Sequence, residues 1–299
     1  MKNAFNILKL LRFIVLCAVV ILPNETLAQT IVDSVKIESH IYKTRGLSRY
    51  ELTVFQPAHR DPDKKLPAIV FFHGGGLRER HTWEFRPQSK FLVDRGMVAV
   101  VATYRVKRHG RTIYESIADA KSAIRWIRER ADEFGIDENR IAAGGGSAGG
   151  YLAACAALIE EYNEPDENLS ISSVPNALVL FNPRLVIPVI GAPPLTKKEI
   201  RYKNGRNLEE ISPVHNVFQG APPTIIFQGT ADTLVSVQES QRFCEAMNKK
   251  KNSCEVFLYE GREHGFFHYD HGTNPDFLST METTERFLSK LGYISQGEQ

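Results

Sequence analysis

The chain has 299 residues, of which 42% are hydrophobic and 24% are charged, an ordinary globular composition with enough apolar residues for one sizeable core. Its 37 Lys and Arg residues nearly balance its 35 Asp and Glu residues, which leaves a formal net charge of +2. This balance gives no overall field that would recruit nucleic acid or an acidic membrane surface, so we expect neither as a partner.

Residues 1–28 have the pattern of a secretory signal peptide. A start with three basic residues is followed by the apolar run FIVLCAVVIL (13–22), and Ala28 is a small residue before a cleavage point. The apolar run is about half of the roughly 20 residues that a membrane-spanning helix needs, which argues against the alternative of an uncleaved anchor. We therefore expect a mature chain, 29–299, that is secreted or periplasmic and not stably inserted in a membrane.

Strand-like and helix-like stretches alternate along the rest of the chain. Two antiparallel strands come first, and most of the later strands are continuous apolar runs, as is typical of strands covered by helices on both faces. This order predicts one α/β domain with a mostly parallel, eight-stranded sheet. The expected strands are 32–39, 49–57, 66–76, 97–105, 140–146, 176–183, 223–232 and 254–261.

Two helices and one insertion stand out between the strands. Apolar residues recur at three- and four-residue steps over 117–134, with Ser116 as the expected N-cap and Gly135 as the expected stop. The same spacing recurs over 277–291. The irregular stretch 185–220, rich in Pro and Lys, is expected to form a small cap or lid between two strands.

The stretch RIAAGGGSAGGYLAA, residues 140–154, fits two chemically incompatible motifs. Three of its glycines have the G-x-G-x-x-G spacing of a dinucleotide-binding loop, and Ser147 stands in a G-x-S-x-G pattern. A dinucleotide loop needs an acidic residue at the end of the next strand, and the expected strand 176–183 ends without one. The context of strand, turn and helix favours a nucleophilic serine, and we expect no cofactor.

A serine hydroxyl needs a base, which an acid in turn orients. On a strand-to-helix turn of this kind, the order along the chain is Ser147, then the acid, then the histidine. Asp232 lies at the end of an expected strand, in IIFQGTAD, and His264 lies just past the last strand, in YEGREHGFF. We predict these three as the catalytic residues. His268 and His271 lie deeper in a polar loop and are expected to be solvated.

The motif HGGG follows an expected buried strand upstream of the serine. Attack on a carbonyl places negative charge on oxygen, and backbone N–H groups aimed at that point stabilise it. We expect the N–H groups of Gly75 and Gly76, together with that of Ala148, to form an oxyanion hole. His73 and Gly74 are expected to support the loop rather than to transfer protons.

The cysteines suggest one cross-link. Cys244 and Cys254 lie ten residues apart and could pair in an oxidising compartment, while Cys155 packs as a small apolar residue. The alternative is two unrelated thiols. No Cys or His cluster has the spacing of metal ligands, so we expect no metal.

Taken together, these motifs resemble those of the α/β-hydrolase superfamily, and more narrowly its hormone-sensitive-lipase-like and acetyl-esterase branch. The resemblance implies Ser147 as nucleophile with Asp232 and His264 as its partners. Members that act on lipids carry Asp before the serine, where this chain has Gly146, and a sizeable N-terminal cap. Both departures bring the chain closer to secreted esterases that remove acetyl groups from plant polysaccharides. The likeness is carried by FFHGGG, TYR, DAKSAIRWIRERADEFGIDENRIAAGGGSAGGYLAA, QGTAD and EHGFF.

The leading hypothesis is a secreted serine esterase that hydrolyses short acyl esters, acetyl above all, on carbohydrate such as xylan, through an acyl-serine. Its partner would be a small-molecule or polysaccharide ester. The alternatives are a serine peptidase or amidase with the same triad, and an inactive binding module. Trp83 could stack on a sugar, and basic residues near the expected mouth, among them Arg105, could meet it; the alternative is a solvated basic rim.

Overall fold

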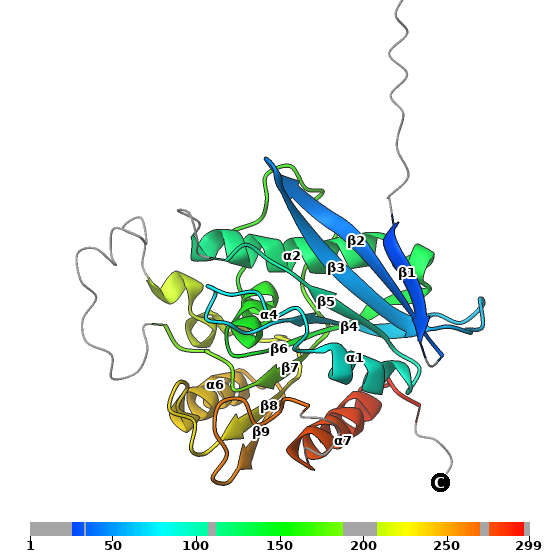
Figure 1. Cartoon of the computed structure of the whole chain (residues 1–299). Coiled ribbons are helices and arrows are strands. Elements are labelled where there is room, and N and C mark those ends of the chain that lie inside the picture. The colour runs from blue at the N-terminus through cyan, green and yellow to red at the C-terminus, as the bar shows by residue number, and fades with distance from the viewer. Residues whose placement is uncertain (1–25, 33, 107–111, 188–207, 270–274, 296–299) are drawn as a thin grey trace, which may run out of the picture.

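The computed structural model describes residues 26–32, 34–106, 112–187, 208–269 and 275–295. These residues form one nine-stranded sheet with helices packed on both of its faces (Figure 1). The strands are β1 (Thr26–Val32), β2 (Val35–Arg45), β3 (Ser48–Pro57), β4 (Leu66–Phe72), β5 (Val98–Ala102), β6 (Ile136–Gly146), β7 (Ala177–Phe181), β8 (Thr224–Gly229) and β9 (Cys254–Tyr259).

The strand order across the sheet is β1-β2-β3-β5-β4-β6-β7-β8-β9. Pairing is antiparallel from β1 through β3 to β5, and parallel from β5 to β9. The α/β fold and its mostly parallel sheet are therefore confirmed. The carboxyl ends of the parallel strands β4, β6, β7 and β8 meet at one edge of the sheet, where α/β proteins build their binding sites.

The predicted count of eight strands is corrected to nine within the described ranges. The added strand, β1, pairs antiparallel with β2 at the sheet edge and includes residues 26–28, the end of the predicted signal peptide. Cleavage after Ala28 would leave residues 29–32 of this strand. Residues 1–25 lie outside the described part of the chain, and no described helix is long and apolar enough to cross a membrane.

Continuous apolar sequence produces the buried centre of the sheet. β5 and β7 are buried at every residue, and β4 at every residue after Leu66. One core lies between the sheet and α2, α4 and α6, and a second lies between the opposite face and α1 and α7 (Figure 1). The helices are α1 (Arg86–Val93), α2 (Ile113–Glu129), α3 (Ala131–Phe134), α4 (Ala148–Leu158), α6 (Val237–Lys249) and α7 (Pro275–Lys290).

Both predicted helices are present, but the first is divided at Arg130 into α2 and α3, and the N-cap of α2 differs from the prediction. Thr112 caps the helix, and its backbone N–H donates to Glu115 Oε2 at 2.7 Å in a capping box. Ser116, the predicted cap, instead donates from its hydroxyl to the carbonyl oxygen of Arg105 at 2.6 Å. Gly135 follows α3 with φ of +63°, as expected for a helix stop that needs a left-handed residue.

The described parts of the predicted cap are residues 185–187 and 208–220. The second of these contains two short 3₁₀ helices, η1 (Leu208–Ile211) and η2 (Pro213–Asn216). They are attached to α4 by Tyr151, whose hydroxyl donates to the carbonyl oxygen of Ile211 at 2.9 Å. Residues 188–207 lie outside the described ranges.

A disulfide joins Cys244 of α6 to Cys254, the first residue of β9, with their Cα atoms 5.2 Å apart. Cys155 is a free thiol buried in α4. Burial raises the pKa of this thiol above its ordinary value, so the group stays neutral. It packs as the small apolar residue that the sequence suggests.

Arg105 is buried and does not belong to a basic rim at the mouth of a site. Its guanidinium contacts the carboxylate of Asp119 at 2.7 and 2.8 Å and also pairs with Glu164. Lys43 approaches the same two acids, at 2.7 Å from Asp119 and 2.9 Å from Glu164. Glu164 also pairs with Arg45 at 2.9 Å, and Arg105 with Glu115 at 3.3 Å, so a network of ion pairs joins β2, α2 and the segment after α4.

This cluster generates a stability prediction. The change Asp119→Asn removes a fully buried carboxylate and leaves Lys43 and Arg105 undercompensated, which commonly costs about 3–5 kcal/mol. We expect a loss of that size in the free energy of unfolding, measured by urea denaturation. Glu285→Gln, which breaks the half-exposed 2.6 Å pair with Arg95, is the control and should cost at most about 1 kcal/mol. Equal losses in both variants would show that Asp119 does not compensate the buried charges of Lys43 and Arg105.

Candidate active site

Ser147 occupies a sharp turn between the end of β6 and the start of α4. Its φ is +53°, a value that residues with a side chain rarely adopt. Its N–H donates to the carbonyl oxygen of Phe181 in β7 at 2.8 Å, and its own carbonyl accepts from Tyr151 in the first turn of α4 at 3.1 Å. The strained backbone holds the serine at the carboxyl edge of the sheet, as a nucleophile on such a turn requires.

The glycines beside Ser147 are required by close packing against β4. A Cβ atom on Gly145 would lie 2.4 Å from the carbonyl oxygen of Phe72, and one on Gly149 would lie only 1.9 Å from it. Both distances are far inside van der Waals contact. The serine turn is therefore packed directly against the point where β4 passes into the HGGG loop.

His264 contacts Asp232 across the next part of the same edge. The ring Nδ1 lies 2.7 Å from Asp232 Oδ2, while Oδ1 accepts the N–H groups of Leu234 and Val235 at 2.8 and 2.9 Å. Burial alone would raise the pKa of Asp232, but the bonds from His264 and the two amides outweigh it and lower that pKa. The carboxylate is thus ionised and holds the imidazole in one orientation.

Asn182 links the histidine to the rest of the site and was not identified from sequence. Its side-chain amide donates to the carbonyl oxygen of His264, and its Oδ1 accepts the N–H of Gly229 at 2.9 Å. It is fully buried, directly after Phe181, the residue whose carbonyl binds Ser147. The one sequence signal was a polar residue ending an apolar strand, in LFNP.

The structure therefore brings the three predicted residues to one edge, through short connections between neighbouring strands. Ser147 is bonded to β7, and Asn182 after β7 is bonded to both the His264 loop and the end of β8. Within the described residues the Ser147 hydroxyl donates to no side chain, and the His264 ring is hydrogen-bonded to Asp232. Hydrogen bonds of this kind often tighten only when substrate binds.

A buried histidine and a buried tyrosine hold the HGGG loop through its carbonyl groups. The His73 ring stacks on Tyr104 with centroids 4.3 Å apart, and its Nδ1 donates to the carbonyl oxygen of Gly74 at 2.7 Å. The Tyr104 hydroxyl donates to the carbonyl of His73 at 2.8 Å. Tyr104 lies in the TYR motif, to which the sequence had assigned no role.

Gly75 and Gly76 adopt backbone conformations that require glycine, with φ of +99° and +61°. The carbonyl of Gly75 accepts the N–H groups of Arg78 and Glu79 at 2.9 and 3.1 Å, which turns the loop back on itself. Within the described ranges, the N–H groups of Gly75 and Gly76 donate to no protein acceptor. Two amides are thus available beside the serine turn.

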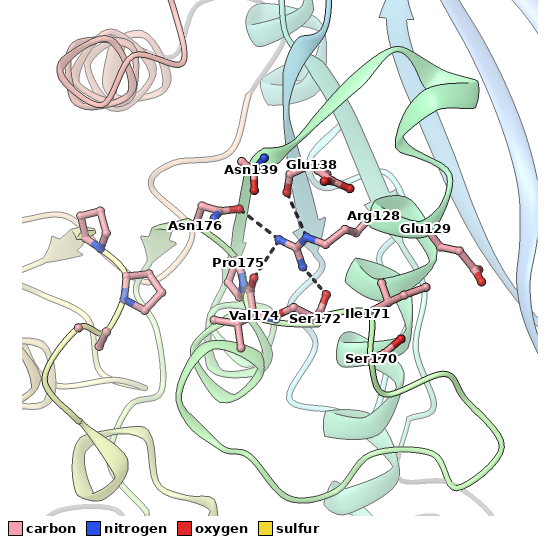
Figure 2. A pocket seen from close by; sticks show the side chains of 14 residues that line it. Arg128, Glu129, Glu138, Asn139, Ser170, Ile171, Ser172, Val174, Pro175 and Asn176 are labelled. Carbon is pink, nitrogen blue, oxygen red and sulfur yellow. Dashed lines mark hydrogen bonds between the residues drawn. The ribbon is translucent and has the colours of Figure 1, made fainter.

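A polar cavity of about 730 Å³ lies at the opposite edge of the sheet (Figure 2). Its lining includes Asn176 and Pro223, which precede β7 and β8. Figure 2 shows Arg128 at its centre, with hydrogen bonds to the carbonyl oxygens of Glu138 and Val174, at 3.1 and 2.9 Å, and to Asn176 Oδ1. Arg128 ties loops together here, and this edge holds none of the predicted site residues.

Comparison with solved structures identifies the family. The thermophilic esterase Est2 from the planctomycete Thermogutta terrifontis superposes with a TM-score of 0.81 and 41% sequence identity, covering 88% of this chain and 95% of that one. The chain belongs to the α/β-hydrolase esterases of the hormone-sensitive-lipase-like branch. Two further structures of Est2, described as propionate-bound and butyrate-bound, match this α/β hydrolase at 41% and 40% identity with TM-scores of 0.80, covering 86% and 87% of this chain and 95% of each.

Family models and curated relatives agree with this assignment. Residues 52–199 match the family BD-FAE, and residues 191–282 match the prolyl oligopeptidase family. The α/β hydrolase is similar to esterase LipC of Mycobacterium tuberculosis, with 28% identity over 69% of this chain and 54% of the relative. It is also similar to an acetylxylan esterase of Xylanibacter ruminicola, with 29% identity over 67% of this chain and 41% of the relative. This chain spans about half the length of these curated relatives.

The buried His73 generates a prediction on pH and stability. Burial lowers its pKa from 6.5 to about 4, although the Gly74 carbonyl and Glu84 act in the opposite direction. Between these values the unfolded chain binds a proton that the folded chain does not, so stability is complete above about 6.5 and falls as the pH falls. We expect this residue alone to contribute a slope approaching 1.4 kcal/mol per pH unit between pH 6 and 5.

The measurement is urea unfolding of the wild type and of His73→Asn at several pH values. Asn has an amide donor where the ring has Nδ1 and does not titrate, so the variant should lose stability less steeply over this range. Parallel pH curves for the two proteins would show that His73 is not held neutral.

Proposed function

We propose that this α/β hydrolase cleaves carboxylic esters, with Ser147 as nucleophile, His264 as general base and Asp232 as the acid that orients it. The observation that carries the proposal is the 2.7 Å contact between His264 and Asp232 at the edge where Ser147 occupies its strained turn. The likeness to Est2 over nearly the whole length of that esterase supports the same activity.

The mechanism follows from which atoms of the triad can donate and which can only accept a hydrogen bond. Asp232 can only accept, so the Nδ1–H of His264 points to it and Nε2 is left to take the proton of the Ser147 hydroxyl. The serine oxygen then adds to the ester carbonyl, and the oxyanion that forms receives hydrogen bonds from the N–H groups of Gly75, Gly76 and Ala148. His264 returns the proton to the departing alcohol, and water repeats the sequence on the acyl-serine to release the acid.

For the substrate we propose short acyl esters, acetyl above all, carried by carbohydrate. Propionate-bound and butyrate-bound forms of Est2 support a short acyl group, and the acetylxylan esterase relative supports a polysaccharide. Trp83 adds support from this chain, because its indole is 55% exposed and lies beside His268, with ring centroids 5.5 Å apart. A flat, half-exposed indole is suited to stack on a sugar ring.

We also propose export, as the N-terminal 28 residues suggest. The disulfide between Cys244 and Cys254 supports an oxidising compartment, because such bonds rarely persist in a reducing cytosol. A second candidate function is peptide or amide hydrolysis by the same three residues. The match of residues 191–282 to the prolyl oligopeptidase family favours keeping this candidate.

The triad is tested with p-nitrophenyl acetate. Ser147→Ala should lower kcat by about 10⁴-fold or more with unchanged thermal stability, because removal of a serine nucleophile eliminates the acyl-enzyme route. A fluorophosphonate probe should label the wild type and not the variant. If the two proteins are equally slow and equally unlabelled, the binding-module alternative gains. Faster cleavage of aminoacyl anilides than of esters would favour the peptidase.

The carbohydrate proposal is tested with Trp83→Ala. Loss of one stacking surface should lower kcat/KM for acetylated xylo-oligosaccharides by about 10-fold, while p-nitrophenyl acetate, which has no sugar, should change less than about twofold. Leu169→Ala removes a similarly exposed apolar side chain, 57% exposed, and serves as the control. Equal losses on both substrates would refute a sugar-binding role.

A further inference from the structure

Glu84 is a buried carboxylate that the mechanism does not use. It lies between the HGGG loop and α1 and is only 4% exposed. Its Oε2 accepts the N–H of Gly74, and its Oε1 lies 2.8 Å from the ring Nε2 of His268. A Cβ atom on Gly146, the residue before Ser147, would lie 3.3 Å from the same Oε1. The carboxylate therefore bonds to the oxyanion loop and the histidine loop and lies beside the serine turn.

We propose that Glu84, paired with His268, is a positioning residue that fixes the oxyanion loop relative to the serine and histidine loops. The proposal rests on the esterase function proposed above. The prediction that His268 is solvated is corrected in part, because its side chain is 33% exposed but its ring lies against a buried carboxylate. His271, covered by the same prediction, lies outside the described ranges.

The geometry of two successive peptide planes supports this role. In the first plane, the N–H of Gly74 donates to Glu84 and the carbonyl of His73 accepts from Tyr104 at 2.8 Å. In the second plane, the carbonyl of Gly74 accepts from His73 Nδ1 at 2.7 Å and from Tyr104 at 3.2 Å. The N–H of Gly75 belongs to this second plane and points opposite to that carbonyl. Its direction is thus set by neighbours that hold both planes.

Within this arrangement Glu84 is the anchor on the N–H edge of the first plane. Without its acceptor, the Gly74 peptide could rotate, and rotation there turns the Gly75 N–H away from the forming oxyanion. An oxyanion donor that is misaimed loses much of its effect on rate, because such donors act through preorganised geometry.

The pairing with His268 also connects Glu84 to the histidine loop. An isolated carboxylate near the forming oxyanion would repel it, and more strongly in a buried place than in water. The 2.8 Å contact between Oε1 and the His268 Nε2 gives this carboxylate a polar partner in its buried place. The same loop thus places His264 on Asp232 and His268 on Glu84, one histidine on each of two carboxylates.

Gln88 strengthens the connection between these loops. Its side-chain amide, from α1, donates to the carbonyl oxygen of Phe267 at 3.2 Å. The Phe267 ring lies against Gly146, where a Cβ atom would be 2.6 Å from it. The segment 264–268 therefore packs against the serine turn beside Glu84. Through Glu84, the oxyanion loop and the histidine loop bind the same buried carboxylate.

The test compares two changes at one position. Glu84→Gln keeps an oxygen acceptor for the Gly74 N–H, whereas Glu84→Leu removes it at similar size. We expect kcat for p-nitrophenyl acetate to fall about 10–100-fold in Glu84→Leu, less than the loss of a whole donor, and about fivefold or less in Glu84→Gln. KM should stay within about threefold in both, because the interaction develops in the transition state.

A second readout is the inhibition constant of a short alkylboronic acid, whose tetrahedral serine adduct also uses the oxyanion hole. It should rise in Glu84→Leu by a factor similar to the fall in kcat. Glu38→Leu, at a buried carboxylate of β2 that accepts from Gln56 at 2.9 Å, is the matched control and should leave kcat and inhibition unchanged. If Glu84→Leu does not fold, Glu84→Ala, which also removes the acceptor for the Gly74 N–H, replaces it and should lower kcat by a similar factor.

Wild-type kcat in Glu84→Leu, or equal losses of kcat in the Leu and Gln variants, would overturn the proposal. A loss confined to KM or to thermal stability would also overturn it. These outcomes differ from failure of the esterase function itself, in which Ser147→Ala would hydrolyse the ester as fast as the wild type.

Discussion

The site depends on one contact between backbones, where the first turn of α4 meets the end of β4. The space between Gly149 and the carbonyl of Phe72 has no room for even a methyl group. Because β4 and β6 are parallel neighbours, this contact aligns the end of one strand with the turn that follows the other. The HGGG loop therefore leaves β4 directly beside Ser147. Donor and nucleophile are brought together by main-chain packing, and side chains then refine the arrangement.

Three carboxylates with buried side chains, two of them at the site, each contact at least one basic side chain. Asp232 is paired with His264, Glu84 with His268, and Asp119 with Lys43 and Arg105. Burial of an unpaired charge costs free energy, whereas a paired charge is stabilised only when its partner lies in the right geometry. Each pair also joins segments that are far apart in the chain. The contact that stabilises a buried carboxylate therefore also holds two segments in place.

The sequence predicted correctly those features that depend on a local pattern of residues. The strand periods, the helix stop at Gly135, the serine between glycines and the order of acid and histidine predicted the fold and the edge at which the candidate residues gather. It failed where a role depends on a distant partner. Nothing local distinguishes His268 from a solvated histidine, because Glu84 is 184 residues away. Arg105 was misread for the same reason, and Asn182 and Tyr104 act through carbonyl groups that no motif encodes.

The disulfide has a consequence for how the chain tolerates cutting. It closes a short loop between α6 and β9 that contains three consecutive lysines, at 249–251, all exposed. A trypsin-like protease that cleaved there would open the polypeptide between Asp232 and His264. The two fragments would remain covalently joined through sulfur, and β9 would keep its place beside β8. In an oxidising environment, a nicked molecule can thus retain its acid and its imidazole in one body, and reduction would be needed before they could part.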